Sequence, residues 1–259
     1  MNTIRRAWQR FPESPAKNRI RVAWHNYRSG GAVHYSVKRE VFTTQIRGVK
    51  INSYDHPFGI DKHLDYYLAR ANIGNGGVVI DAGAFDGQVT LFFACKVGLT
   101  GKVIAIEPDE QNIVKLRKNI SINRSCNNIT IMDELLWSKA EWVDFCAQGN
   151  VASSVLWKPE GKAISQRLTT TIDVIVRSMM LSRVDFIKMN IEGAEIKAIE
   201  GASDTIRRFR PDFAIASNHL VGGKYTFSAV EELLREYDYN VETIFFAPTY
   251  CYTYANAHR

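Results

Sequence analysis

The stretch Val78-Val79-Ile80-Asp81-Ala82-Gly83-Ala84-Phe85-Asp86-Gly87 decides the fold of this chain. Its first three residues are apolar and β-branched, without polar alternation, which is typical of a parallel strand covered on both faces. Asp81 ends the apolar run, Gly83 permits a positive φ or a close approach of a ligand, and Gly87 stands where a following helix would press against the loop. The stretch therefore predicts a strand, a glycine-turned loop and a helix that together form a cofactor cradle.

The acid that closes this strand indicates which cofactor the loop would take. A dinucleotide fingerprint needs G-x-G-x-x-G, whereas this loop reads D-x-G-x-x-x-G, which disfavours an NAD-dependent oxidoreductase. The second predicted strand ends in Glu107-Pro108-Asp109, where an acid can accept hydrogen bonds from both hydroxyls of a ribose. Two such acids fit S-adenosylmethionine (SAM), which carries an ammonium, a sulfonium and a ribose but no phosphate.

After the cradle the sequence alternates between strand-like and helix-like segments, which predicts an α/β fold with a doubly wound, mostly parallel sheet and helices on both faces. We expect strands near 78–82, 103–107, 129–132, 186–189 and 212–216, and helices near 87–97, 110–123, 193–200 and 226–237. An inserted hairpin is expected from β-rich runs at 142–146 and 168–172, which flank a polar loop at 149–154. An antiparallel pair at 241–246 and 250–254 is expected to close the sheet edge.

We divide the chain into three parts: a basic N-terminal extension with a hairpin and a helix at 1–77, the main domain at 78–254 and a disordered tail at 255–259. No apolar run is long enough to cross a membrane, and the N-terminus lacks the apolar core and cleavage site of a secretory signal. The four cysteines are scattered without metal-ligand spacing. We therefore expect a cytoplasmic protein with free thiols and no metal site.

The positive charge is concentrated at the N-terminus. Residues 1–50 hold 11 Lys and Arg against 2 Asp and Glu, a difference of +9, in a chain whose net charge is +6. Such a segment can bind a nucleic acid, an anionic membrane surface or an anionic substrate, or can be an ordinary solvated face. We expect its aromatic residues Trp8, Phe11, Trp24 and Tyr27 to pack against the main domain rather than to stack on bases.

Several motifs, read in order, resemble those of the FkbM family of SAM-dependent methyltransferases. They are the cradle, Glu107-Pro108-Asp109, Thr170-Thr171-Ile172-Asp173 and the stretch from Val184 to Glu195, whose K-x-N-x-E-G-A-E segment is followed by Gly201-Ala202. The similarity extends from Val78 to Tyr250. It implies a Rossmann-like class I methyltransferase fold with a seven-stranded sheet, and usually O-methylation of a sugar, polyketide or other small natural-product hydroxyl.

The resemblance also implies which residues hold the cofactor. Those around its methionine part would be Asp81, Gly83, Ala84, Phe85 and Gly87. Glu107, with Pro108 beside it, would hold the ribose, and the residues near the adenine would be Asp133, Glu134 and Leu135. The chain departs from the family at Asn190, where an aspartate is usual. An amide at this position can still orient the cofactor or the substrate through hydrogen bonds.

Methyl transfer to a hydroxyl requires an aligned acceptor and a group that removes the hydroxyl proton. Candidates for this general base are Glu192, His219, Glu195 and Asp185. His219 is our first choice because it follows the fifth predicted strand, at the edge of the sheet where such folds bind ligands, although a structural loop histidine is the alternative. Lys188 interrupts an apolar strand, so its ammonium needs a partner among Glu192, Glu195 and Asp81, and it either orders the loop or contacts the substrate.

These observations favour a SAM-dependent methyltransferase that acts on the hydroxyl of a sugar, a glycan or a small natural product. An RNA methyltransferase is the alternative with the same cofactor, because of the basic and aromatic N-terminus. A noncatalytic protein that keeps the fold for binding is the alternative from another class, because Asn190 replaces the usual acid.

Overall fold

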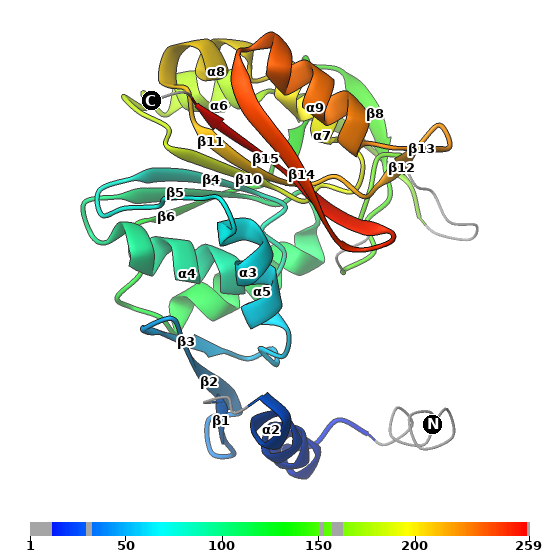
Figure 1. Cartoon of the computed structure of the whole chain (residues 1–259). Helices are drawn as coiled ribbons and strands as arrows, with labels where there is room; N and C mark the ends of the chain where they lie inside the picture. The colour runs from blue at the N-terminus through cyan, green and yellow to red at the C-terminus, as the bar shows by residue number, and fades with distance from the viewer. Residues whose placement is uncertain (1–11, 30–32, 151–152, 157–162, 258–259) are drawn as a thin grey trace.

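The computed structural model describes residues 12–29, 33–150, 153–156 and 163–257. Its centre is a seven-stranded sheet in the order β14-β15-β11-β10-β4-β5-β6 (Figure 1). The strands are β4 (Val78–Ala82), β5 (Lys102–Ile106), β6 (Ile129–Met132), β10 (Phe186–Met189), β11 (Asp212–Ala216), β14 (Tyr239–Ala247) and β15 (Tyr250–Ala257). Neighbours from β11 to β6 pair in parallel, whereas β15 is antiparallel to both β11 and β14. The predicted doubly wound, mostly parallel sheet is confirmed.

Helices cover both faces of this sheet (Figure 1). One face carries α3 (Ile60–Leu68), α4 (Gln88–Val97) and α5 (Glu110–Ser121), and the other α6 (Ile172–Ser178), α7 (Glu195–Glu200), α8 (Ser203–Phe209) and α9 (Phe227–Glu236). Successive residues of one strand enter different cores: Val79 packs in the cluster with α3 and α4, and Ile80 in the cluster with α6 to α9. Because both faces are covered, the strands have the uninterrupted apolar character seen in the sequence.

A small N-terminal unit lies at the end of the molecule remote from the large sheet (Figure 1). It consists of α2 (Pro15–Ser29) and the antiparallel strands β1 (Val33–Ser36), β2 (Val41–Ile46) and β3 (Val49–Ser53). The β2–β3 hairpin was predicted, whereas α2 was not. Trp8 and Phe11 lie outside the residues that the structure describes.

Trp24 and Tyr27 are exposed, contrary to the packing that we expected. The reason is that the inner side of α2 is occupied by other residues. Val22 packs against the cluster of Val33, Tyr35 and Phe42. Asn26 donates a hydrogen bond to the carbonyl oxygen of Val33 (2.7 Å) and accepts one from its amide (3.1 Å).

The inserted segment forms a second small sheet, β7 (Leu135–Leu136), β9 (Ser165–Thr170) and β8 (Trp142–Phe145). β8 and β9 pair in the predicted antiparallel manner, and β7 adds to β9 in parallel. A short hairpin, β12 (Leu220–Val221) and β13 (Lys224–Tyr225), precedes α9. None of the helices described is long and apolar enough to cross a membrane.

The end of the chain differs from our expectation of a disordered tail at 255–259. β15 continues to Ala257 because it is an inner strand with a partner on each side: Ala255 pairs with both Phe213 and Val241 and is fully buried. Residues 258–259 lie outside the described part of the chain.

Candidate functional site

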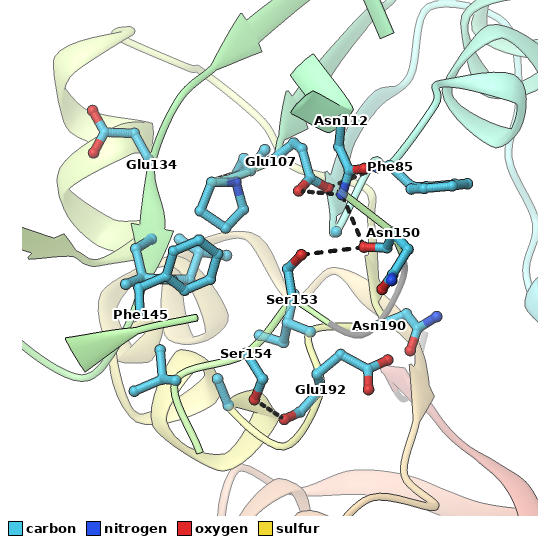
Figure 2. Close-up of a pocket in the computed structure, with 18 residues that line it drawn as sticks. Phe85, Glu107, Asn112, Glu134, Phe145, Asn150, Ser153, Ser154, Asn190 and Glu192 are labelled. Carbon is cyan, nitrogen blue, oxygen red and sulfur yellow. Dashed lines mark hydrogen bonds between the residues drawn. The ribbon is translucent and has the colours of Figure 1, made fainter. Parts of the chain in front are cut away.

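A cavity of about 610 Å³, here called the first cavity, lies at the carboxyl ends of β4, β5, β6 and β10 (Figure 2). The loops that follow these strands contribute Gly83 and Phe85, Glu107 and Pro108, Glu134 and Leu135, and Asn190 to Glu192. The opposite wall comes from the inserted segment and consists of Phe145, Asn150, Ser153 and Ser154. Glu107 and Pro108, predicted for the ribose, therefore line one cavity with Glu134 and Leu135, two of the three residues predicted near the adenine.

Glu107 is buried at the wall of this cavity and is fixed by three donors. Its Oε2 accepts a hydrogen bond from the Phe85 amide (2.8 Å), and its Oε1 accepts from the Asp109 amide (3.1 Å) and from Asn112 Nδ2 (3.2 Å). Burial raises the pKa of Glu107 above its ordinary value, against the effect of these donors. The carboxylate is thus held in one orientation before any ligand binds.

Asp109 and Asn112 hold the inserted loop over the first cavity. Asp109 caps α5 and, with Oδ2, accepts hydrogen bonds from the Gly149 amide (2.8 Å) and from Ser153 Oγ (2.5 Å). Asn112 donates to the carbonyl oxygen of Asn150 (3.0 Å) as well as to Glu107. The two residues therefore connect the helix after β5 with the far wall of the cavity.

The Gly83 loop is packed against the end of β10. Gly83 has φ +78°, and a Cβ atom built on it would lie 2.0 Å from the carbonyl oxygen of Asn190. The Gly83 amide donates to the carbonyl oxygen of Ile106 (2.9 Å), which ties the loop to β5 as well. Only glycine fits this backbone conformation and this contact.

Asp81 and Lys188 form a buried ion pair beneath the same loop. Lys188 Nζ lies 2.9 Å from Asp81 Oδ1 and donates to the carbonyl oxygens of Ala82 (3.1 Å) and Gly83 (2.6 Å), while Thr90 Oγ1 donates to Asp81 Oδ2 (2.6 Å). Burial alone would lower the pKa of Lys188, but Asp81 raises it above its ordinary value. Asp81 is fully buried and lines neither this cavity nor the second one described below, so its place beside the methionine part of the cofactor stays a prediction.

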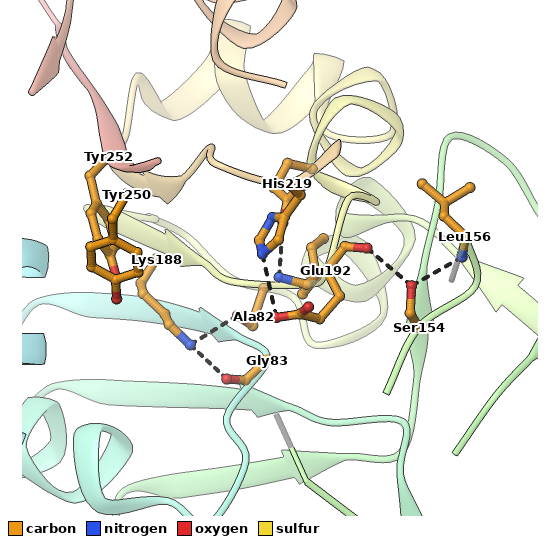
Figure 3. A network of polar contacts seen from close by, with 11 residues as sticks. Ala82, Gly83, Ser154, Leu156, Lys188, Glu192, His219, Tyr250 and Tyr252 are labelled. Atoms are coloured by element: carbon orange, nitrogen blue, oxygen red, sulfur yellow. Dashed lines mark hydrogen bonds and ion pairs between the residues drawn. The ribbon is translucent and has the colours of Figure 1, made fainter. Parts of the chain in front are cut away.

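His219 lies between two carboxylates (Figure 3). Its Nε2 is 3.3 Å from Glu192 Oε1, and its Nδ1 is 3.0 Å from Glu195 Oε1. Burial alone would lower the pKa of His219, but the two carboxylates raise it to about 10. The imidazole is therefore protonated at neutral pH, which does not fit our first choice of this residue as general base.

Asp185 lies at the opposite end of β10, where its Oδ2 accepts from the Val78 amide (2.8 Å) and from Arg183 (2.8 Å). Glu195 is fully buried, and its Oε1 also accepts from the Ile191 amide (3.0 Å). Of the four base candidates, only Glu192 lines the first cavity.

A second cavity of about 890 Å³ adjoins the first and shares Gly83, Phe85 and Asn190 with it. Its other side is formed by residues that precede the main sheet, His56, Phe58, His63 and Tyr67, and by two residues that follow β4, Asp86 and Gln88. Asp86 is buried, accepts hydrogen bonds from the Gln88 amide (3.2 Å) and Gln88 Nε2 (2.7 Å), and has its pKa raised to about 6 by burial. Burial also lowers the pKa values of His56 and His63, so both rings are neutral at pH 7.

Several predicted residues lie away from the first cavity. Ala84 and Lys188 line the second cavity. Gly87 borders neither cavity; a Cβ atom there would meet Leu116 Cδ1 at 2.3 Å, so it serves the packing of α5. Asp133 points away and pairs with Arg167 (2.7 Å).

Sequence reasoning did not single out Asn112, Phe145, Asn150 and Ser153. The signal for Asn150 and Ser153 was the polar loop at 149–154, and Phe145 lay in the β-rich run at 142–146; we expected both segments only as parts of an insertion. Asn112 gave no signal, because an amide inside a predicted helix has no distinctive sequence pattern. Within the described ranges, no group of His, Cys, Asp and Glu is arranged to hold a metal ion, and all four cysteines are free.

Comparisons with known proteins agree with this geometry. The family model described as the methyltransferase FkbM domain matches residues 81–241. The methyltransferase FkbM from Methylobacillus flagellatus KT superposes with a TM-score of 0.54 at 20% identity, over 72% of this chain and 45% of that chain, so this chain spans less than half of that protein. A comparison with curated proteins gave no match.

Two fibrillarins are similar to this chain at lower identity. The pre-rRNA processing fibrillarin of Methanococcus jannaschii gives a TM-score of 0.50 at 12% identity, over 87% of this chain and 97% of that chain. The fibrillarin of Aeropyrum pernix, solved with natively bound S-adenosyl-L-methionine, gives a TM-score of 0.48 at 11% identity, over 86% of this chain and 97% of that chain.

Proposed function

The chain belongs to the FkbM methyltransferase family, and from this premise we propose that it transfers the methyl group of SAM to a hydroxyl oxygen of a sugar, a glycan or another small natural product. The observation that carries the proposal is the buried, pre-oriented Glu107 in a cavity at the carboxyl ends of the central parallel strands. Ligands of open α/β sheets bind at this edge.

The first cavity fits the adenosine part of SAM. Glu107 can accept hydrogen bonds from both ribose hydroxyls, and Asn112 Oδ1 beside it is buried without a partner among the described residues. The apolar side chains of Pro108, Leu135 and Phe145 line the space beyond and suit the faces of an adenine. Once bound, the cofactor supplies a methyl group activated by a sulfonium.

The methionine part fits at Gly83 and Asn190, where the first cavity meets the second. Lys188 and Asp81 lie beneath and hold the loop rather than the ligand, since each is engaged by the other and by backbone or hydroxyl groups. The Asn190 amide keeps a donor and an acceptor at this junction. It can orient cofactor or acceptor without the negative charge of the family's usual aspartate.

The second cavity fits the methyl acceptor. It shares the wall at Gly83 and Asn190 with the cofactor cavity, so an acceptor there lies next to the transferred group. Phe58 and Tyr67 offer aromatic surface, and the neutral imidazoles of His56 and His63 offer hydrogen bonds without net charge. Such a lining suits an uncharged polyhydroxyl compound better than a phosphate-rich one.

Asp86 is the proton acceptor in this proposal, in place of His219. Its carboxyl lies at the wall of the second cavity, and its raised pKa of about 6 makes it a stronger base than an exposed aspartate while leaving it ionised at pH 7. His219 would instead position the loop after β10 by binding Glu192 and Glu195.

Titration calorimetry with SAM and S-adenosylhomocysteine, with NAD as the control, tests the cofactor assignment. We expect both adenosyl compounds to bind and NAD not to bind. A screen with methyl-labelled SAM against sugars, glycans and small hydroxyl compounds then tests the acceptor. Failure of both adenosyl ligands to bind would contradict the proposal and favour the noncatalytic alternative, whereas label transfer to RNA alone would overturn the acceptor class.

A further inference from the structure

The helix α2 presents most of its apolar residues to solvent, while several polar residues, together with Val22, face the protein. Ile20, Trp24 and Tyr27 are 56%, 61% and 84% exposed, and Ala16 and Ala23 are exposed beside them. These five residues are called the α2 stripe. On the inner side, Lys17 is buried against Glu13, and Asn26 binds β1. A helix on the surface of a soluble protein has the opposite arrangement, so the stripe needs a separate explanation.

The stripe is continuous and has arginines on both edges. With 3.6 residues per turn, its members fall within an arc of about 100°. Arg19 and Arg28 fall just outside the arc, on opposite sides, and both are exposed. Arg28 lies over the ring of Trp24, 5.9 Å from its centroid.

These arginines are not neutralised within the described part of the chain. The nearest acid in sequence, Glu13, precedes the helix and binds Lys17 and Arg21 instead, and neither Arg19 nor Arg28 forms an ion pair with a described residue. The described surface at the edges of the stripe is thus basic.

We propose that α2 is an interfacial anchor whose stripe inserts into an anionic lipid surface while Arg19 and Arg28 bind lipid headgroups. An apolar arc with tryptophan and tyrosine, flanked by arginines that can extend to the headgroups, is the pattern of helices that lie in a membrane interface. α2 lies at the end of the molecule remote from the large sheet (Figure 1).

Other occupants fit less well. Single-stranded RNA would stack on Trp24 and Tyr27 but would leave Ile20 and the two alanines without a role. A second copy of this chain would bring the same unneutralised arginines to the interface, and α2 itself, from Pro15 to Ser29, contains no acid that could pair with them.

Vesicle flotation of the full chain tests the anchor. We expect the protein to float with vesicles of phosphatidylcholine and phosphatidylglycerol and to stay behind with phosphatidylcholine alone. The stripe variant I20S/W24S/Y27S should lose this binding. The matched control L99S/V114S/M180S replaces residues elsewhere that are 75%, 65% and 88% exposed, and should float as the unmodified protein does.

The charge variant R19Q/R28Q should bind anionic vesicles about 25-fold more weakly, because each arginine near such a surface contributes about fivefold. Absence of flotation for the unmodified protein, or equal flotation of the stripe variant, would overturn the proposal. Retention of a single-stranded RNA probe without vesicle binding would assign the surface to nucleic acid. A dimer in light scattering that only the stripe variant abolishes, again without vesicle binding, would assign it to a second copy. Titration with SAM tests the methyltransferase site independently of vesicle binding, so the membrane-anchor proposal and the methyltransferase proposal can be refuted separately.

Discussion

The contact between the Gly83 loop and Asn190 makes a quantitative prediction for Gly83→Ala. Gly83 and Gly48 have nearly the same backbone, with φ values of +78° and +80°. The new Cβ atom at position 83 would lie 2.0 Å from the carbonyl oxygen of Asn190, whereas at position 48 nothing lies within 4 Å. The left-handed conformation costs a residue with a Cβ atom about 1–2 kcal/mol at either position.

At position 83 the overpacking adds about 1–3 kcal/mol, because the loop or the end of β10 must move. Gly83→Ala should therefore lower the free energy of unfolding by about 2–5 kcal/mol. The matched control Gly48→Ala should lower it only by the cost of the left-handed conformation, about 1–2 kcal/mol. Urea unfolding followed by circular dichroism measures both. Calorimetry should also show weaker SAM binding for Gly83→Ala alone, because the shift moves the wall of the first cavity. Equal stability losses, or unchanged SAM affinity in Gly83→Ala, would refute the reasoning.

Three further predictions address the charged groups. His219→Gln should lower the unfolding free energy at neutral pH by about 3–5 kcal/mol, because it leaves buried carboxylates unpaired. The pKa of His219 in the folded protein is raised from 6.5 to about 10, so the stability that this residue gives the fold is complete below pH 6.5 and is lost as the pH rises through 10. If the difference in urea stability between the unmodified protein and the variant stays constant over this range, the pairing is disproved. Glu107→Ala should weaken SAM binding by about tenfold or more in calorimetry, whereas Asp133→Ala, which removes a carboxylate outside the cavity, should not. Asp86→Asn should reduce turnover while the affinity for SAM is retained. The activity of the unmodified protein should fall as the pH drops through about 6, because Asp86 then becomes protonated. If the variant has the same rate and the same pH profile as the unmodified protein, Asp86 is not the proton acceptor.

The central strands could be predicted from sequence because their burial on both faces gives runs such as Val78 to Ile80, which have few other structural explanations. Four strands, at 78–82, 129–132, 186–189 and 212–216, have the predicted bounds. Helix α2 could not be predicted in the same way. Apolar residues at helical spacing were present at Ile20, Ala23, Trp24 and Tyr27, but the many basic residues between and around them gave the segment the composition of a polar extension.

The position of the site could also be predicted, but the tasks of single residues within it could not. Glu107 lies at the cavity because the strand that carries it ends there. Asp81 lies near the end of β4 and His219 follows β11 in the same sheet, yet each is engaged by an oppositely charged side chain that is distant in sequence. Such long-range pairs depend on the packing of the whole sheet, which strand patterns do not contain.

The order of the last two strands has a consequence for synthesis on the ribosome. β14 emerges before β15 but reaches the sheet only through it, since β15 lies between β14 and β11. Until residue 257 has been made, β11 therefore keeps an open edge and β14 has no partner in the sheet. Open strand edges promote pairing with other chains. Nascent chains stalled before this point are thus the species of this protein that we expect to depend most on chaperones.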